Sequence, residues 1–554
     1  MKAYNHNWLS SLRRVRWAVL FAVLLVTLWA CTSHPLTQPI PDPVQETDAQ
    51  ITIVPMRHLD LIFMVDNSPS MQPKQDKMKA QFPKLIEALR DPGDNTLPDL
   101  RIALLDSDLG AGRSSNCGGT VNFGDKGQFQ MRDAAGCGAN ANALWLEYTK
   151  NQPVNFTGEL STVFGCLASN LGVAGCGFEH QIGALEWAFF LSDNKSQLDF
   201  LRPEAYLGIV LLTDEDDCTA PPDTNMFNNR EKAESWSLRC ATRGHQCANT
   251  QLTFPNPGAV SVPYASCQAR MDATCDSSTV DTSVATACNP LENITTLANA
   301  VKQLKGGGSD ADEKILVAGI YGTPRAGDTS APLYKIDLTP DPTTGAAADA
   351  KVWDYYPICY DPAYPPAASG FDKTAADHGA TGGLRIDAFL NEFPADSRLA
   401  YSICESDFGP AMAGIGKALA NKMGKLCVPF KLVDKSDQPG LQANCRVAYR
   451  IPRPVQDKNG NTTIRYDENS DSLPACDASR TPDCWEVKFG NANGTTEEKD
   501  IATRCPATSS APSQTINVVR KPDSALPDGT KVTMQCLTCV DPIPGVPPSK
   551  GCNY

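Results

Sequence analysis

An acidic residue and two hydroxyl residues directly follow a strongly apolar run in the first part of the chain. The run covers residues 59–65, and Asp66, Ser68 and Ser70 come after it at alternate positions. Such a run, with an amphipathic helix pattern behind it, predicts a central strand of a parallel sheet. Loops at the carboxyl ends of these strands bind ligands, and carboxylate and hydroxyl oxygens suit Mg²⁺ or Ca²⁺ better than zinc. The alternative is that Ser68 or Ser70 only caps the helix.

A second apolar run ends in a cluster of acidic residues. It covers residues 206–212, and Asp214 follows it after one threonine. If the two predicted strands lie side by side, Asp66 and Asp214 meet at one rim of the sheet. Further acidic residues follow this strand and the strand predicted at 100–105, and they extend the predicted acidic rim around the metal. These outer residues are Asp106, Asp108, Asp216 and Asp217.

The paired loops resemble the metal-ion-dependent adhesion site of the von Willebrand factor A (VWA) family. That site joins an Asp-x-Ser-x-Ser loop, a threonine from a second loop and an aspartate after a later strand. The resemblance implies that Ser68 and Ser70 bind the cation through their hydroxyls, while Asp66 and Asp214 act directly or through water. It also implies one Mg²⁺ or Ca²⁺ ion, a doubly wound α/β sheet and a macromolecular ligand.

One position departs from the family pattern. In the family, the threonine stands a few residues before an Ala-Leu pair that begins a helix, and here Glu179 takes that place before Ala184 and Leu185. Glu179 as a third carboxylate ligand would weaken the attraction of the cation for an acidic partner. The alternative is that Glu179 only stabilises the N-terminus of the helix.

The N-terminal segment has the features of an export signal. Basic residues precede an apolar run over residues 17–30, which is shorter than the ~20 residues of a membrane span. The run ends before Cys31, and this junction resembles the lipobox of bacterial lipoproteins, whose cysteine carries lipid. Residues 1–30 are therefore predicted to be a signal peptide and 31–58 a proline-rich tether, with Thr32 indicating the outer membrane. An uncleaved anchor is the alternative, and both place the remaining chain outside the cytoplasm.

The cysteine count agrees with export. The chain has 21 cysteines, so 20 remain for pairing once Cys31 is set aside. Cys536 and Cys539 form a Cys-x-x-Cys motif, but no second such pair completes a zinc site. Structural disulfides are therefore the favoured interpretation.

Charge and motifs exclude or disfavour two functional classes. The net charge of −14 and the scattered basic residues argue against nucleic acid as a partner. No His-Glu-x-x-His, Gly-x-Ser-x-Gly or glycine-rich phosphate motif is present, so the chain is not expected to be an enzyme. A nucleophile pair of Ser68 and His180 is one route by which the chain could still be a hydrolase.

Strand and helix patterns alternate over residues 59–435, which predicts a mostly parallel sheet with helices on both faces. The length requires insertions, and the second begins at the acidic rim, so we expect a disulfide-bonded lobe to wall the metal face. Residues 436–554 instead show short β-type runs and are predicted to form a cysteine-rich β module. The predicted insertions are 109–160, 218–288 and 323–380.

Three functional hypotheses follow. The favoured one is an exported, lipid-anchored protein that binds a protein or other macromolecule through its metal, in adhesion or in assembly of the envelope or surface. In the second, the metal only stabilises loops and partners bind the inserted lobes. The third is a metal-assisted hydrolase.

Overall fold

The computed structural model divides into two compact parts. The larger part lies within residues 50–429 and 446–534, and the smaller part within 1–49, 430–445 and 535–554. The residues that the structure describes are 44–47, 58–90, 96–112, 124–203, 205–222, 224–227, 234–248, 250–251, 261–271, 289–328, 332, 334–340, 351–367, 373–424, 426–428, 430–435, 441–456, 462–466, 472–477, 484–495, 498–499, 501–502, 505, 507, 511–519, 531–539 and 552.

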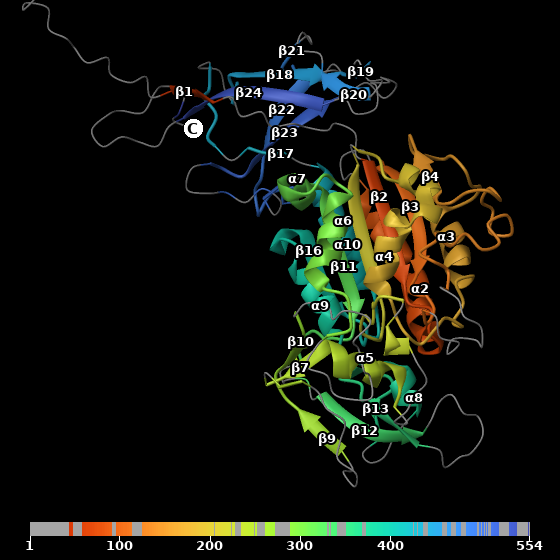
Figure 1. Ribbon diagram of the computed structural model, residues 1–554. Helices are drawn as coiled ribbons and strands as arrows, with labels where there is room; N and C mark the ends of the chain where they lie inside the picture. Colours follow the sequence, from red (N-terminus) through yellow and green to blue (C-terminus); the bar gives the residue numbers. More distant parts are fainter. Residues whose placement is uncertain are drawn as a thin grey trace, which may run out of the picture. The chain divides into compact units, whose positions relative to one another are not determined.

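A seven-stranded sheet forms the centre of the larger part (Figure 1). Its strands lie in the order β16-β11-β6-β2-β3-β4-β5. The five strands from β16 to β3 pair in parallel, and β4 at the edge runs antiparallel to both β3 and β5. Read from β4 to β16 and numbered by their order in the chain, with β5 left out, these six strands follow the order 3-2-1-4-5-6 of a doubly wound sheet. The α/β fold with a mostly parallel sheet is thus confirmed. The strands are β2 (His58–Val65), β3 (Asp99–Asp106), β4 (Leu146–Thr149), β5 (Gln152–Pro153), β6 (Tyr206–Leu212), β11 (Ile315–Tyr321) and β16 (Arg398–Ser402).

The strand order reverses between β2 and β6. Val65 at the end of β2 pairs with Leu212 at the end of β6, so both strands end at the same edge of the sheet. At such a switch point the following connections run to opposite sides and leave a crevice between them. The loops that begin at Asp66 and Thr213 stand at this crevice.

Helices bury both faces of the sheet. Alternate residues of β2 enter two separate hydrophobic clusters, with Leu61 and Phe63 in one and Ile62 and Met64 in the other. The first cluster includes residues of α2, α3 and α10, and the second includes residues of α4, α6 and α9. The near-continuous apolar character of β2 follows from burial on both faces. The helices are α2 (Gln72–Leu89), α3 (Leu160–Ser169), α4 (Gln181–Phe190), α6 (Ile294–Gln303), α9 (Leu384–Asn391) and α10 (Gly409–Gly424).

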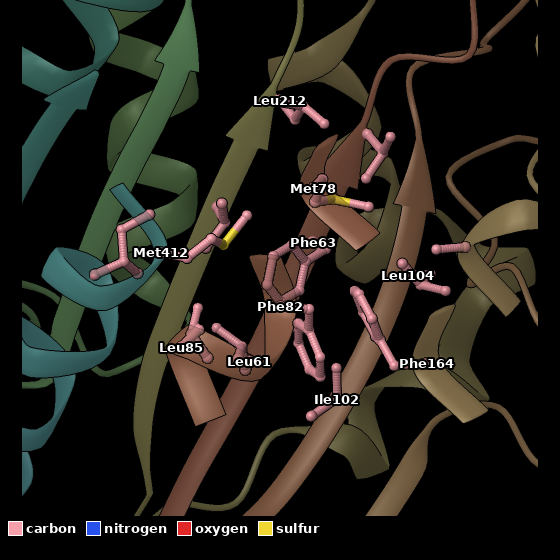
Figure 2. Packing of buried hydrophobic residues seen from close by; sticks show 14 of the residues in the cluster. Leu61, Phe63, Met78, Phe82, Leu85, Ile102, Leu104, Phe164, Leu212 and Met412 are labelled. Atoms are coloured by element: carbon pink, nitrogen blue, oxygen red, sulfur yellow. The ribbon is translucent and has the colours of Figure 1, made fainter. Parts of the chain in front are cut away.

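Three phenylalanines form the centre of the first cluster (Figure 2). The ring of Phe63 lies 5.7 Å from Phe82 and 5.0 Å from Phe164, and the rings of Phe82 and Phe164 stack at 3.7 Å. They join β2, α2 and α3, and all three are fully buried. Helix α2, which follows the Asp-x-Ser-x-Ser loop, is therefore held against the sheet by direct aromatic packing.

Two elements depart from the expected organisation. The edge strand β4 comes from the predicted insertion 109–160, and α3 begins at Leu160 where that insertion was expected to end. Leu160, Val163, Phe164 and Leu167 are buried at helical spacing. The apolar signal of α3 is short and follows a glycine- and asparagine-rich stretch, which concealed it in the sequence.

Disulfides fasten the inserted segments. Cys218–Cys240 and Cys247–Cys267 lie in the second insertion, and Cys137–Cys166 links the first insertion to α3. Cys359–Cys404 links the third insertion to the chain just after β16. The second and third insertions share the sheet β13-β12-β9, formed by Lys351–Tyr355, Tyr334–Pro340 and Ser261–Tyr264.

The C-terminal region contains the expected short strands. In the larger part β23 (Gln514–Val519) pairs antiparallel with both β17 (Leu426–Cys427) and β22 (Cys484–Phe489). β19 (Pro452–Gln456) and β20 (Thr462–Tyr466) pair antiparallel, and the sequence between them contains Asn459-Gly460, a dipeptide typical of hairpin turns that lies outside the described residues. The boundary predicted at residue 436 stays a prediction.

In the smaller part, β1 (Val44–Thr47) pairs antiparallel with the end of β24 (Lys531–Cys539). Cys536 is bonded to Cys445, and Cys539 is bonded to Cys552, so the two cysteines of the Cys-x-x-Cys motif have different partners. In the portion of the chain with described structure, no helix combines the length and apolarity that a membrane crossing requires. The predicted signal peptide and Cys31 lie outside that portion.

Replacement of Phe82 by alanine tests the role of the aromatic cluster. We expect Phe82→Ala to lower the free energy of unfolding by about 3–5 kcal/mol, because it leaves a cavity between α2 and the sheet. The measurement is urea unfolding followed by tryptophan fluorescence. Phe190→Ala is the matched control, since that ring is 54% exposed, and a loss there as large as for Phe82 would contradict the assignment.

Candidate functional site

The loops after β2 and β6 are joined by a buried carboxylate. Asp66 is fully buried, and its Oδ1 accepts a 2.8 Å hydrogen bond from the backbone N–H of Ser68. Its Oδ2 accepts a 2.7 Å bond from the hydroxyl of Thr213, the residue before Asp214. The structure therefore places Asp66, Ser68 and Ser70 beside the start of the second acidic loop.

A glycine lets the loop that carries Glu179 approach the first loop. The N–H of Gly175 donates to the carbonyl of Asn67 at 2.9 Å. A Cβ at Gly175 would lie 2.0 Å from the Oδ1 of Asn67, so any other residue would have to displace this buried side chain. The close contact needs glycine at this position, and it brings the loop leading to Glu179 against the Asp-x-Ser-x-Ser turn.

The two serine hydroxyls lie together at the outer end of the loop. The Oγ atoms of Ser68 and Ser70 are 3.3 Å apart. Adjacent ligands of an octahedral ion are separated by about 3.0 Å for Mg²⁺ and about 3.4 Å for Ca²⁺, given bonds of about 2.1 and 2.4 Å. Ser68 makes no side-chain capping hydrogen bond to the short helix at Pro69–Met71. The hydroxyl spacing thus suits two neighbouring positions of one cation, with the partly exposed Ser70 on the solvent side.

Glu179 lies within the same group of side chains. Its carboxyl is 1% exposed, Oε2 accepts a 2.5 Å hydrogen bond from Ser107, and Oε1 has no hydrogen-bond partner. The N-terminal N–H groups of α4 are instead bound by Asp217 and Thr219. Glu179 therefore does not cap this helix, and its free oxygen is an available ligand.

Lys74 supplies a buried positive charge at this site, although its position was not expected from the sequence. The Nζ of Lys74 donates to the Oδ2 of Asp214 at 2.5 Å, to the carbonyl of Ser70 at 3.2 Å and to the carbonyl of Asp377 at 2.6 Å. Lys74 is 1% exposed, and Asp214 keeps its Oδ1 without a partner. The signal in the sequence was a lysine in the stripe of α2 that otherwise carries apolar residues such as Met78.

The rim contains more negative than positive charge. Burial, followed by the charge of Asp214, raises the pKa of Asp66 to about 6. Burial, with Asp66 and Glu215 nearby, raises the pKa of Glu179 well above its usual range. The pKa of Glu215 is raised in the same way, by burial and then by Asp214. Lys74 balances one carboxylate, so the remainder must be compensated by protons or by another cation.

The donor atoms available at this site are all oxygens. Within the described ranges, no three His, Cys, Asp or Glu side chains form a group that could hold a metal ion by themselves. A cation here would depend on the serine hydroxyls together with the unpartnered oxygens of Glu179 and Asp214. This all-oxygen set fits Mg²⁺ or Ca²⁺, while the ammonium of Lys74 places a resident positive charge against it.

Asp216 and Asp217 have other partners. Asp216 accepts from the backbone N–H of Arg385 at 2.9 Å, and its Oδ2 lies 2.5 Å from the Nε2 of His245. Asp217 pairs with the guanidinium of Arg385 at 3.0 Å and accepts from the N–H of Ile182. These two carboxylates hold the N-termini of α9 and α4 at the rim.

Asp106 and Asp108 form a second acidic group with Asp125. Arg132 binds Asp106 at 3.3 Å and Asp125 at 2.5 Å. Burial, followed by Asp125, raises the pKa of Asp106 well above its usual range. Asp108 accepts a 2.7 Å hydrogen bond from the N–H of Gly110. Arg132 therefore partly balances this group.

The contacts of His180 do not assemble a nucleophile pair. Its Nε2 lies 3.0 Å from the carbonyl oxygen of Gly110, and its ring packs on Phe227. The side chain is buried, which lowers its pKa. The hydroxyl of Ser68 contacts Ser70 instead.

The inserted segments wall the rim. Ser237 of the second insertion donates to Glu215 at 2.7 Å, and the N–H of Thr381 donates to the carbonyl of Asp214 at 3.0 Å. Asp377 of the third insertion accepts from Lys74. The expectation that a disulfide-bonded lobe lies at the acidic rim agrees with these contacts.

Comparisons with known proteins give neighbours only among solved structures. A von Willebrand factor type A protein from Catenulispora acidiphila is 10% identical, with a TM-score of 0.23 over 88% of this chain and 58% of its own. The pilus adhesin SpaC from Lactobacillus rhamnosus GG is 10% identical, with a TM-score of 0.26 over 86% and 48%. The human COPII-coat protein Sec24c is 8% identical, with a TM-score of 0.23 over 88% and 44%.

The chain thus spans about half the length of these structures. No family model and no curated protein matches the sequence. TM-scores of this size add nothing to the strand order described above.

The raised pKa of Asp66 predicts a pH dependence for the cation-free protein. The folded chain keeps this proton up to pH of about 6, whereas the unfolded chain loses it near 3.8, so stability falls as the pH rises between these values. The displacement corresponds to at most about 3 kcal/mol. We expect Asp66→Asn to flatten this fall in urea titrations at pH 4 to 7 with EDTA present.

The control for this prediction is Asp76→Asn, which changes an exposed carboxylate of α2. It should leave the slope of stability against pH as in the wild type. An Asp66→Asn profile that parallels the wild-type profile would contradict the assignment.

Proposed function

We propose that the chain is an exported, non-enzymatic binding protein that docks a protein or other macromolecular partner at the rim of its sheet through one Mg²⁺ or Ca²⁺ ion. The observation that carries the proposal is that two hydroxyls 3.3 Å apart, Ser68 and Ser70, and two carboxylates with an unpartnered oxygen, Glu179 and Asp214, lie close to Asp66 at the switch point. Open α/β sheets bind ligands at this place. The Asp-x-Ser-x-Ser loop and the later aspartate also match the VWA resemblance.

Each side chain has a defined role in this proposal. Ser68 and Ser70 would hold the cation directly, with Asp66 and Asp214 acting directly or through water, and Glu179 would supply a third carboxylate. When bound, the cation offers an open coordination position to an oxygen of the partner. Asp66 orients the loops through its bonds to the Ser68 N–H and the Thr213 hydroxyl, and the half-buried Ser70 faces the entry side.

The charges at the rim influence which partner oxygen is favoured. One dication and the Lys74 ammonium would neutralise the carboxylates of Asp66, Glu179 and Asp214, and the nearby Glu215 adds further negative charge when it is ionised. An acidic side chain therefore gains little from the site, and a carbonyl or hydroxyl oxygen of the partner suits it better. This differs from a rim with two carboxylates, which would leave excess positive charge for an anion.

The seven disulfides among the described residues indicate a location outside the cytoplasm. We propose in addition that Cys31 carries lipid and anchors the chain in the outer membrane. Binding at the rim would then serve adhesion or the assembly of an envelope or surface structure.

A scaffold role is the second candidate. It is favoured by the contacts of Lys74, which already join α2, Asp214 and the third insertion. In this case the cation only stabilises loops, and partners bind the inserted lobes that wall the rim.

Replacement of both serines separates the two candidates. We expect the Ser68→Ala, Ser70→Ala double variant to lose bound Mg²⁺ or Ca²⁺, because the two hydroxyls are the direct ligands of the proposed site. Metal content is measured after equilibrium dialysis. Retention of envelope proteins from the producing cell is measured on the immobilised chain, with the cation or with EDTA.

The Ser192→Ala, Ser196→Ala double variant is the control, since it also removes two serine hydroxyls from one short segment and both serines are exposed. Partner retention lost together with the metal supports docking through the cation. Metal loss with undiminished retention would reject docking at the rim and support the scaffold.

The lipid anchor is tested separately. We expect Cys31→Ser to abolish incorporation of labelled palmitate and to release the chain from the membrane fraction, because the thiol is the predicted acylation site. Labelling and fractionation of the producing cell provide the measurement. Thr32→Ser is the control, and an unlabelled wild-type chain would contradict the proposal.

A further inference from the structure

The Lys74 ammonium lies at the centre of the candidate cation site. It is 1% exposed, and its three acceptors are the Oδ2 of Asp214 and the carbonyls of Ser70 and Asp377. Two of these acceptors belong to the residues proposed to surround the metal. An ammonium with three oxygen acceptors neutralises carboxylate charge and holds oxygen atoms of several segments together, as a bound metal ion would.

We infer that Lys74 is the resident counter-ion of the rim and that it competes with a divalent cation for Asp214. This inference rests on the proposed cation site. Lys74 holds the loops together when no metal is bound, and it lowers the affinity of the rim for Mg²⁺ or Ca²⁺. The rim is therefore assembled in both states, and the cation must overcome an internal competitor to bind.

The geometry at Asp214 supports competition. The Oδ2 atom is bound to Lys74 at 2.5 Å, while the buried Oδ1 has no partner. A cation bound at Oδ1 would share one carboxylate with the ammonium, at a short distance and with little water between the two charges. Their repulsion in this buried place must weaken binding or move the lysine away.

The side chain of lysine suits this role. Its charge is a compact, strongly hydrated ammonium at the end of a flexible stem, so it can leave for solvent when a stronger cation takes its place. The planar guanidinium of an arginine would be harder to remove from the same contacts.

Departure of Lys74 would also affect the third insertion. The carbonyl of Asp377, which accepts from Lys74 at 2.6 Å, closes the short helix α8 (Lys373–Asp377). This contact ties α8 to the start of α2. Cation binding is thus coupled to the contact that fixes α8 of the third insertion to the start of α2.

The test compares the full chain with its Lys74→Met variant by isothermal titration with MgCl₂ and CaCl₂. We expect Lys74→Met to bind at least one of the two ions at least tenfold more tightly than the wild type. Without metal, the variant should unfold at a lower temperature, because Asp214 loses its counter-ion, and added cation should restore most of the difference. Hydrogen exchange of residues 373–377 should be faster in the variant and, when cation is added, in the wild type.

Lys77→Met is the matched control. Lys77 lies one turn further along α2 and binds the buried Asp361 at 2.5 Å, so its removal also leaves a carboxylate unpaired. It should destabilise the chain without changing the affinity for the cation. If Lys74→Met does not fold, Lys74→Gln takes its place and should likewise bind the cation more tightly than the wild type.

The outcomes distinguish the inference from the proposed function. Equal affinities of the wild type and the Lys74 variant overturn the inference and leave the cation site in place. Binding by neither chain overturns both. Tighter binding by the Lys74 variant, with an unchanged Lys77 variant, supports both.

Discussion

Negative charge at the carboxyl edge of the sheet is the constraint on which the remaining structure depends. Asp66, Glu179 and Asp214 are almost inaccessible to water, and like charges buried together are unfavourable. The chain compensates them with the ammonium of Lys74 on Asp214 and with hydroxyl donors on the other two. The loops can assemble only in the arrangement that supplies these donors. A divalent cation bound as proposed would supply the same compensation more strongly, and it would compete with the lysine for Asp214.

The topology of the sheet creates this concentration of charge. Since β2 and β6 are neighbours in the sheet but distant in the chain, their parallel pairing places Asp66 next to Thr213 across 147 positions of sequence. The aromatic packing of Phe63 against α2 prevents that helix from moving away from the repelling carboxylates. The hydrophobic core thus provides the free energy that holds the charged rim together.

Neighbouring acidic residues of the second loop have different partners. Asp214 faces Lys74, while Asp216 and Asp217 turn to the N-termini of α9 and α4 and to Arg385. The capping carboxylates satisfy helix N–H groups and anchor the inserted segments at the rim. One short acidic sequence therefore contributes both the candidate ligand and the framework around it.

The sequence by itself determined the alternation of strands and helices, the two loops of the rim and the use of cysteine, because periodicity and local composition record burial and export. It did not reveal α3, whose short apolar signal follows a loop-like stretch, or the pairing of the cysteines. Only the tertiary structure decided that Lys74 enters the rim, that Glu179 leaves the helix cap to Asp217, and that Asp106 and Asp108 join Arg132. Each of these depends on which side chains the sheet brings together over long separations in the chain, and a linear pattern carries no information on such contacts.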